Sequence, residues 1–71
     1  MEVLIFKTNI IEEAQVYRIK SLLSNVKSVC EWNLDLDDCD RILRVVAPGL
    51  QPRFIESLLE TSGIYCQELE D

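Results

Sequence analysis

The stretch VLIFKTNIIEEAQVYRIKSLLSNV (residues 3–26) decides the fold. It opens with four apolar residues over 3–6, rich in strand-forming types, and continues with polar residues at 7–9. From residue 12 onward, apolar residues recur at the spacing of three and four that is typical of a helix with one apolar face. They are Val16, Ile19, Leu22, Leu23 and Val26. The pattern predicts a buried strand followed by a helix over roughly residues 11–25.

The predicted start of this helix is polar. Asn9 and Glu12, three positions later, resemble a capping pair, and Glu12 and Glu13 fall in the first turn, where the helix dipole favours negative charge. A carboxylate pair can also serve acid–base catalysis, but adjacent helical residues point about 100° apart. We therefore interpret Glu12 and Glu13 as capping residues.

Four further elements follow along the chain. They are a half-buried strand over 29–36, a strand over 42–46, a helix over 51–61 and a short strand over 64–69. The two middle strands form a predicted hairpin, because turn-forming acids separate them. Pro52 suits the first turn of the second helix, and Gly63 suits its C-terminal cap.

The order strand–helix–strand–strand–helix–strand predicts an α+β, ferredoxin-like fold: a four-stranded antiparallel sheet of order 4-1-3-2 with both helices on one face. The segment IKSLL (residues 19–23) recurs as IESLL (residues 55–59), and the same offset carries Cys30 onto Cys66. This similarity is either an internal repeat or a coincidence between two amphipathic helices. Residues 1–71 are expected to form a single domain.

Length and composition restrict the class of protein. A chain of 71 residues, 48% hydrophobic and 28% charged, indicates one globular domain with few apolar residues to spare for an enclosed pocket. The net charge of −6 argues against nucleic acid and anionic membranes as partners. The absence of His excludes Ser-His triads and His-containing zinc motifs. No apolar run suits a signal peptide or a membrane span, so we expect a cytoplasmic protein. We do not expect an enzyme, because the chain has no His, no nucleophile next to a base, no phosphate loop and too small a core for a closed pocket.

The three cysteines are candidates for chemistry. Cys30, Cys39 and Cys66 match no common zinc framework. The topology places Cys30 and Cys66 at opposite edges and ends of the sheet, too far apart for a disulfide, whose Cα atoms lie within about 7 Å. Cys39 and Cys66 share an end, on strands about 14 Å apart. We expect buried or half-buried free thiols, with Cys39 and Cys66 as alternative metal ligands.

The predicted hairpin concentrates negative charge. Its acids are Asp35, Asp37, Asp38 and Asp40. Clustered carboxylates suit calcium, but the Gly and the closing Glu of an EF-hand loop are missing. A solvated hairpin tip is the better interpretation, because Asp favours turns.

Two apolar segments can be buried in more than one way. Trp32 is either a core residue or an exposed anchor for a partner, and its phase with the leucines at 34 and 36 favours the core. The first strand is apolar on both faces. If Leu4 and Phe6 face the helices, Val3 and Ile5 contribute to an exposed patch suited to dimerisation.

With these residues placed, the chain resembles the heavy-metal-associated domains, a family of small copper chaperones and metal-binding modules of metal-transporting ATPases. The resemblance covers nearly the whole chain. It rests on FKTNI (residues 6–10) and on Ile19, Leu22, Leu23, Val26, Val29, Leu58 and Gly63.

This resemblance implies that Ile10 anchors the metal loop, and that the two cysteines of the family's C-x-x-C motif correspond to Glu12 and Gln15. Copper(I) prefers soft thiolates, whereas a carboxylate and an amide offer hard oxygen. In the family, a Tyr or Lys before the last strand often lies near the metal. Either Ile64 or Tyr65 matches that position.

The sequence therefore predicts a domain of this kind that has lost its usual metal ligands and binds other proteins. The expected partner has a basic surface, and the protein itself is a monomer or a weak homodimer. The candidate partner-binding residues are Asn9, Glu12, Glu13, Asp37, Asp38 and Tyr65. No cofactor is expected; the alternative is copper or zinc bound by a relocated or intermolecular thiol site.

Overall fold

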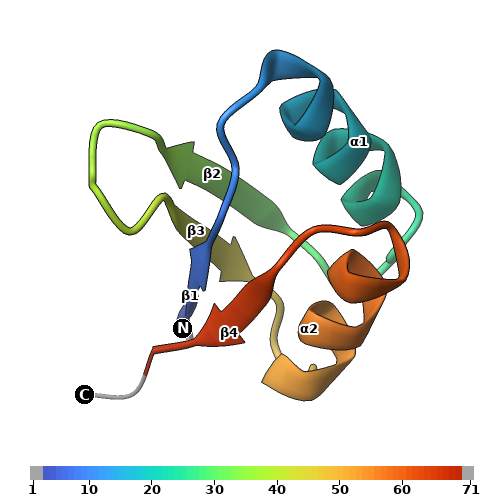
Figure 1. Cartoon of the computed structure of the whole chain (residues 1–71). Helices are drawn as coiled ribbons and strands as arrows, with labels where there is room; N and C mark the ends of the chain where they lie inside the picture. Colours follow the sequence, from blue (N-terminus) through green and yellow to red (C-terminus); the bar gives the residue numbers. More distant parts are fainter. Residues whose placement is uncertain (1–2, 70–71) are drawn as a thin grey trace.

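The computed structural model describes residues 3–69 and shows one sheet covered by one layer of helices (Figure 1). The elements are β1 (Val3–Thr8), α1 (Glu13–Ser24), β2 (Glu31–Asp35), β3 (Ile42–Val46), α2 (Pro52–Thr61) and β4 (Cys66–Glu68). The predicted order of strands and helices is confirmed.

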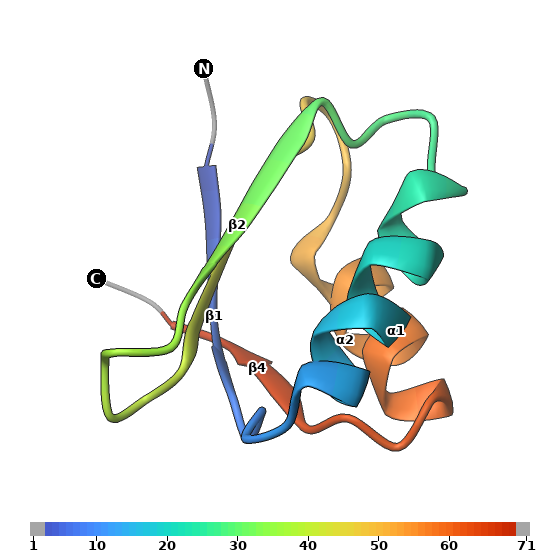
Figure 2. The same ribbon diagram turned by 90° about the horizontal axis from the view of Figure 1, so that it is seen from above.

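The four strands form one antiparallel sheet in the order β2-β3-β1-β4, which is the predicted order read from the opposite edge. Strand β1 is central: Phe6 pairs with Leu43 of β3 on one side and with Glu68 of β4 on the other. Both helices lie on the same face of the sheet, and the other face is open (Figure 2). The predicted ferredoxin-like fold is therefore confirmed.

Strand β1 shows how the sheet divides its residues between the two faces. Leu4, Phe6 and Thr8 are buried on the helix side, while Val3 is 48% exposed on the open side. The strand extends two residues beyond the predicted apolar run, because the buried alternation continues through Thr8.

The core joins both halves of the chain. Its members are Leu4, Phe6, Ile10, Ile19, Leu23, Leu43, Val45, Ala47, Ile55, Leu59, Ile64 and Cys66.

The two hairpin strands place Trp32 in the core, as its phase predicts. Trp32 and Leu34 are partly buried and pack against the core cluster. The prediction that Leu36 shares this face is wrong, since β2 ends at Asp35 and Leu36 is 40% exposed. The strand ends because the Asp35 Oδ1 atom accepts a hydrogen bond of 3.2 Å from the Asp37 N–H, which turns the chain.

Helix α2 ends where the sequence predicts. Gly63 has a φ of +83°, a left-handed conformation that glycine adopts without a Cβ clash. Its N–H donates to the Glu60 carbonyl at 2.9 Å, and the Ile64 N–H donates to the Leu59 carbonyl at 3.0 Å. These two bonds form a Schellman motif. Because Ile64 belongs to this cap, β4 starts at Cys66, two residues later than predicted.

No helix in residues 3–69 is long and apolar enough to span a membrane.

Candidate functional site

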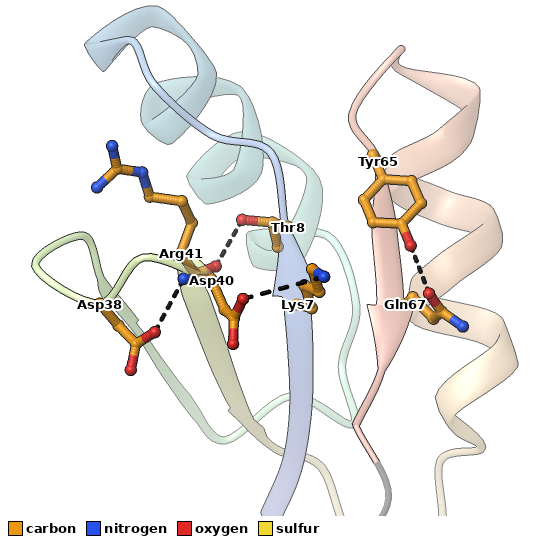
Figure 3. A network of polar contacts seen from close by, with 7 residues as sticks. All are labelled: Lys7, Thr8, Asp38, Asp40, Arg41, Tyr65 and Gln67. Carbon is orange, nitrogen blue, oxygen red and sulfur yellow. Dashed lines mark hydrogen bonds and ion pairs between the residues drawn. The ribbon is translucent and has the colours of Figure 1, made fainter.

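Three connections meet at one end of the sheet, which we call the loop end: residues 9–12 between β1 and α1, residues 36–41 of the hairpin, and residues 62–65 before β4 (Figure 2). Thr8 joins the first two. Its N–H donates to the Asp40 carbonyl at 3.1 Å, and its Oγ1 donates to the Arg41 carbonyl at 2.6 Å (Figure 3). The loop end is therefore a connected surface.

Asn9 joins the first connection to the third. Its Oδ1 accepts a hydrogen bond of 3.1 Å from the Tyr65 N–H. This bond uses the side chain that the sequence assigned to capping α1, so the predicted pairing of Asn9 with Glu12 as a helix cap is wrong. Helix α1 starts later than predicted, at Glu13, because the chain first turns inward to bury Ile10 completely.

Glu12 is the N-cap residue of α1, and Gln15 provides the returning bonds. The Gln15 Oε1 atom accepts the Glu12 N–H at 3.0 Å and the Ile11 N–H at 2.8 Å. Backbone N–H groups at a helix start have no partner within the helix, and a Gln three positions after the N-cap is suited to accept them. The connection from β1 to α1 is thus closed by a side chain of α1 itself.

Ile10 and Ile11 have opposite environments. Ile10 is fully buried and fixes the connection in the core, whereas Ile11 is 76% exposed at the loop end. Glu12 and Glu13 follow it and are also exposed. The loop end therefore presents one large apolar side chain beside carboxylates.

The hairpin adds further negative charge. Asp37 and Asp38 are exposed, and the Asp38 Oδ1 atom accepts the Asp40 N–H at 2.8 Å, which stabilises the turn (Figure 3). The Asp40 carboxylate lies 3.9 Å from the Lys7 Nζ atom, so part of the charge is offset. Arg41, with a φ of 50°, donates from its guanidinium to the Leu36 carbonyl.

One group of metal-ligating side chains occurs in residues 3–69. Oxygens of Asp38 and Asp40 and the Cys39 Sγ atom all lie within 4.8 Å of one another. Two carboxylates and one thiol mix hard and soft donors, which suits neither calcium nor copper(I). Both carboxylates already have partners in the hairpin or in β1. The donor set therefore does not fit either metal.

The three thiols have different environments. Cys30 and Cys39 are exposed, and only Cys66 is buried. The prediction of buried or half-buried thiols is wrong for the first two, because Cys30 precedes β2 and Cys39 lies at the hairpin tip. The described residues contain no disulfide.

Cys66 is poorly suited to bind metal. It pairs with Thr8 on the buried face of the sheet and is 2% exposed. Burial, and to a smaller extent the negative charges of Glu56 and Glu60, together raise the pKa of its thiol from 9.0 to about 12. Metal ligation requires the thiolate, which this environment disfavours. The thiols of Cys39 and Cys66 therefore face different environments, one solvent and one core.

Tyr65 is the large side chain of the third connection that reaches the surface. Ile64 is 1% exposed, whereas Tyr65 is 43% exposed. The Tyr65 hydroxyl donates to the Gln67 Oε1 atom (Figure 3). Of the two residues that the sequence left open at this position, Tyr65 is the one available to a partner. Residues 3–69 contain no pocket.

Sequence reasoning missed three residues that shape the loop end. Thr8 was interpreted as a polar strand end, although its position in the alternation of β1 indicates burial. Gln15 was interpreted as a lost ligand, although its distance from Glu12 is that of a capping box. The exposure of Ile11 is indicated only weakly by the sequence. Two adjacent isoleucines follow the first strand, and only one of them is needed to anchor the loop in the core.

Comparisons with solved structures identify the fold. The solution structure of the yeast copper transporter domain Ccc2a, in its apo and Cu(I)-loaded states, superposes with a TM-score of 0.84 at 19% identity. The match covers 100% of this chain and 99% of that one. The Cu(I)-loaded first domain of the human copper chaperone for SOD1, CCS, gives a TM-score of 0.78 at 21% identity, covering 93% and 89% of the two chains.

The chain has the ferredoxin-like fold of the heavy-metal-associated domains. No family model matches the sequence, and no curated protein matches it. The relation to the two copper-binding domains is therefore one of structure, and the metal site has to be judged from the residues of this chain.

Proposed function

We propose that this chain is a non-catalytic protein-interaction module that keeps the heavy-metal-associated fold without a metal site in its first loop. The observation that supports this proposal is the pair of hydrogen bonds accepted by Gln15 from Ile11 and Glu12. The residues at both positions implied for the C-x-x-C ligands are thereby part of the cap of α1.

Two physical arguments favour this role over metal binding. Glu12 and Gln15 offer only oxygen donors, which bind copper(I) poorly compared with thiolates. The N-terminus of α1 also carries a partial positive charge, which a carboxylate at Glu12 stabilises directly. The start of α1 is therefore closed by side chains of the loop and the helix themselves, with no metal needed for it.

The proposed partner is a protein with a basic surface that docks on the loop end. The contact residues are Asn9, Ile11, Glu12, Glu13, Asp37, Asp38 and Tyr65. Ile11 supplies an apolar anchor, and the surrounding carboxylates attract the partner and orient it. The net charge of −6 adds a long-range attraction for a cationic protein.

A copper(I) titration tests the absence of the loop site. The fully reduced protein is titrated in competition with a strong copper(I) chelator, beside the double variant Glu12→Cys with Gln15→Cys. The wild type should leave copper with the chelator, and the double variant should take up one equivalent. Stoichiometric uptake by the wild type would refute the proposal and favour the alternative, a relocated or intermolecular thiol site for copper or zinc; Cys39→Ser and Cys66→Ser would then locate it.

The same double variant controls for the fold. If it binds copper(I) while the wild type does not, the scaffold remains competent and the two side chains alone account for the difference. If neither protein binds copper, the loop geometry differs from that of a metal-binding domain, and the correspondence of Glu12 and Gln15 with the ligand positions fails.

Salt dependence tests the proposed partner surface. Binding of a cationic partner should weaken by at least tenfold when ionic strength rises from about 0.05 to 0.5 M, because the Debye length falls several-fold. Charge reversal by Glu12→Lys with Glu13→Lys should have a similar effect. A complex that tolerates both changes does not use the loop end.

A further inference from the structure

Strand β2 leaves one edge of the sheet open. Residues 31–35 pair with β3 on one side, and no strand of the described chain pairs with them on the other (Figure 1). The opposite edge, β4, is only three residues long. An unpaired edge strand presents a row of backbone N–H and C=O groups to which a further strand can add. Of the two edges, β2 is therefore the better template.

The two faces of β2 specify different side chains for an added strand. Glu31, Asn33 and Asp35 point to the open face, and Trp32 and Leu34 point to the core side, where both are only partly buried. A neighbouring strand that places apolar residues beside Trp32 and Leu34 would cover the rest of their surface. The open face requires polar or charged partners instead.

Charge on the open face favours a cationic neighbour. In β3, Arg44 pairs with Asn33, and its Nη1 atom lies 4.0 Å from the Asp35 Oδ2 atom. The sign of charge thus alternates from β3 to β2. A strand with basic residues beside Glu31 and Asp35 would continue that alternation, since opposite charges on adjacent strands stabilise pairing.

The same charges disfavour a second copy of this chain. Full-length antiparallel pairing of two β2 strands, centred on Asn33, would place Glu31 of each copy opposite Asp35 of the other. Like charges directly opposite one another destabilise strand pairing. Moving the register by two residues avoids this arrangement only by shortening the paired segment. The β2 edge therefore disfavours pairing with a second copy of itself and favours pairing with a strand of opposite charge.

We propose that the β2 edge binds an extended segment of another protein, with Lys or Arg beside Glu31 and Asp35 and apolar residues beside Trp32 and Leu34. The required pattern has two basic residues four positions apart, with apolar residues at the second and fourth positions of that span. Only Asp35 of this surface adjoins the loop end, through the hydrogen bond that it accepts from the Asp37 N–H. Residues 31–34 lie outside the loop end, so the proposal does not depend on whether the first loop binds metal.

A defined peptide tests the pattern. The probe is Gly-Ser-Lys-Val-Thr-Val-Lys-Val-Ser-Gly, and its control carries Glu in place of both lysines. Backbone amide NMR shifts of the protein are followed during titration at about 0.15 M salt, where the Debye length is about 8 Å. The basic peptide should shift the amides of residues 31–35 and slow their hydrogen exchange. The acidic peptide should bind at least tenfold more weakly.

Charge-reversal variants separate this edge from the loop end. Glu31→Lys with Asp35→Lys should weaken binding of the basic peptide at least tenfold and should bind the acidic peptide instead. Glu31→Lys alone leaves the Asp35–Arg44 pair intact and should give a smaller loss in the same direction. Glu12→Lys with Glu13→Lys should change the affinity by less than about threefold, because these residues lie at the loop end.

Three results would overturn the proposal. They are absence of binding by the basic peptide, equal binding of both peptides, and shifts confined to the loop end. A variant whose amide spectrum shows loss of folding is replaced by Glu31→Lys alone. Failure here leaves the copper titration result unchanged, so the two proposals fail separately.

Discussion

The two β-α-β halves of the chain agree in their helix cores. Matching positions of α1 and α2, 36 residues apart, have nearly equal burial: Ile19 and Ile55 are fully buried, and Leu23 and Leu59 are 1% and 0% exposed. Leu22 and Leu58 are both partly buried. The recurring segment thus corresponds to one structural role used twice, whatever its origin.

The halves differ at the ends of their helices. Helix α1 is closed at its N-terminus by the side chain of Gln15, and its C-cap residue is Asn25, with a φ of −88°. Helix α2 starts with Pro52, uses no side-chain bond at its N-cap, and ends in a glycine cap. The two helices therefore agree at the positions that pack in the core, and they differ at the end positions that connect them to the loops. Of the three connections at the loop end, the first half supplies residues 9–12 and the second half supplies residues 62–65.

The largest expected effect tests the shared core. Ile19→Ala and Ile55→Ala should each lower the free energy of unfolding by about 2–5 kcal/mol, because each removes a fully buried side chain. Ile11→Ala, at a 76% exposed position, should change it by less than about 0.5 kcal/mol. Urea unfolding measures all three.

The equivalence of the two helix cores is refuted if Ile19→Ala or Ile55→Ala lowers the free energy of unfolding as little as Ile11→Ala does. Should the Ala variants not fold, Ile19→Val and Ile55→Val provide milder versions, with expected losses of about 0.5–1.5 kcal/mol each.

The next effect tests the C-terminal ends. Gly63→Ala should destabilise the protein by about 1–2 kcal/mol, since a residue with a Cβ is strained at a φ of +83°. No atom outside Gly63 and its two chain neighbours lies within 4 Å of the added Cβ, so the loss reports backbone strain alone. Asn25→Ala is the matched change in α1 and should cost less than about 0.5 kcal/mol. Equal losses in thermal or urea unfolding would show that the two ends are equivalent after all.

A smaller effect tests the N-terminal ends. Gln15→Ala should lower the free energy of unfolding by about 1 kcal/mol, because the N–H groups of Ile11 and Glu12 lose their acceptor. Gln51→Ala removes the N-cap side chain of α2, which makes no such bond, and should cost less than about 0.3 kcal/mol. Gln15→Glu keeps an acceptor and should restore most of the loss. Equal costs for Gln15→Ala and Gln51→Ala in urea unfolding would mean that the cap is unimportant.

The sequence predicts the fold better than the loop end. Spacing of apolar residues fixes which residues enter the core, and right-handed crossovers fix the order of strands, so both follow from local rules. Pro52 and Gly63 mark the ends of α2 through their backbone geometry alone.

The loop end depends instead on choices between competing partners. Asn9 was equally able to cap α1 or to accept the Tyr65 N–H, and only the tertiary structure decides that Tyr65 is near. The ends of β1 and β4 follow the same rule, because side-chain bonds of Thr8 and Asn9 help to set them. These two contacts join residues far apart in the chain, and no local pattern indicates them. The end of β2 is different, because the bond from the Asp37 N–H to Asp35 is local and typical of a turn.

The last prediction concerns proton binding by Cys66, which changes the free energy of unfolding least at neutral pH. Cys30 lies 36 residues earlier and is the matching residue of the first half. Cys66 is buried and its pKa is raised to about 12, while Cys30 is exposed. In the unfolded chain the thiol of Cys66 loses its proton near its ordinary value of 9.0, whereas the native protein retains it. Between these two values the native state binds more protons, so its stability falls as pH rises.

Cys66→Ala removes this proton linkage. The decline in the free energy of unfolding from about pH 8 to pH 11 should therefore be shallower in this variant than in the wild type, as measured by urea unfolding across that range. Cys30→Ala is the control, and its decline should match the wild type because it removes an exposed thiol and leaves the buried thiol of Cys66 in place. If Cys66→Ala declines as steeply as the wild type, desolvation of this thiol contributes nothing to alkaline unfolding. The difference between the two halves would then rest on the helix ends alone.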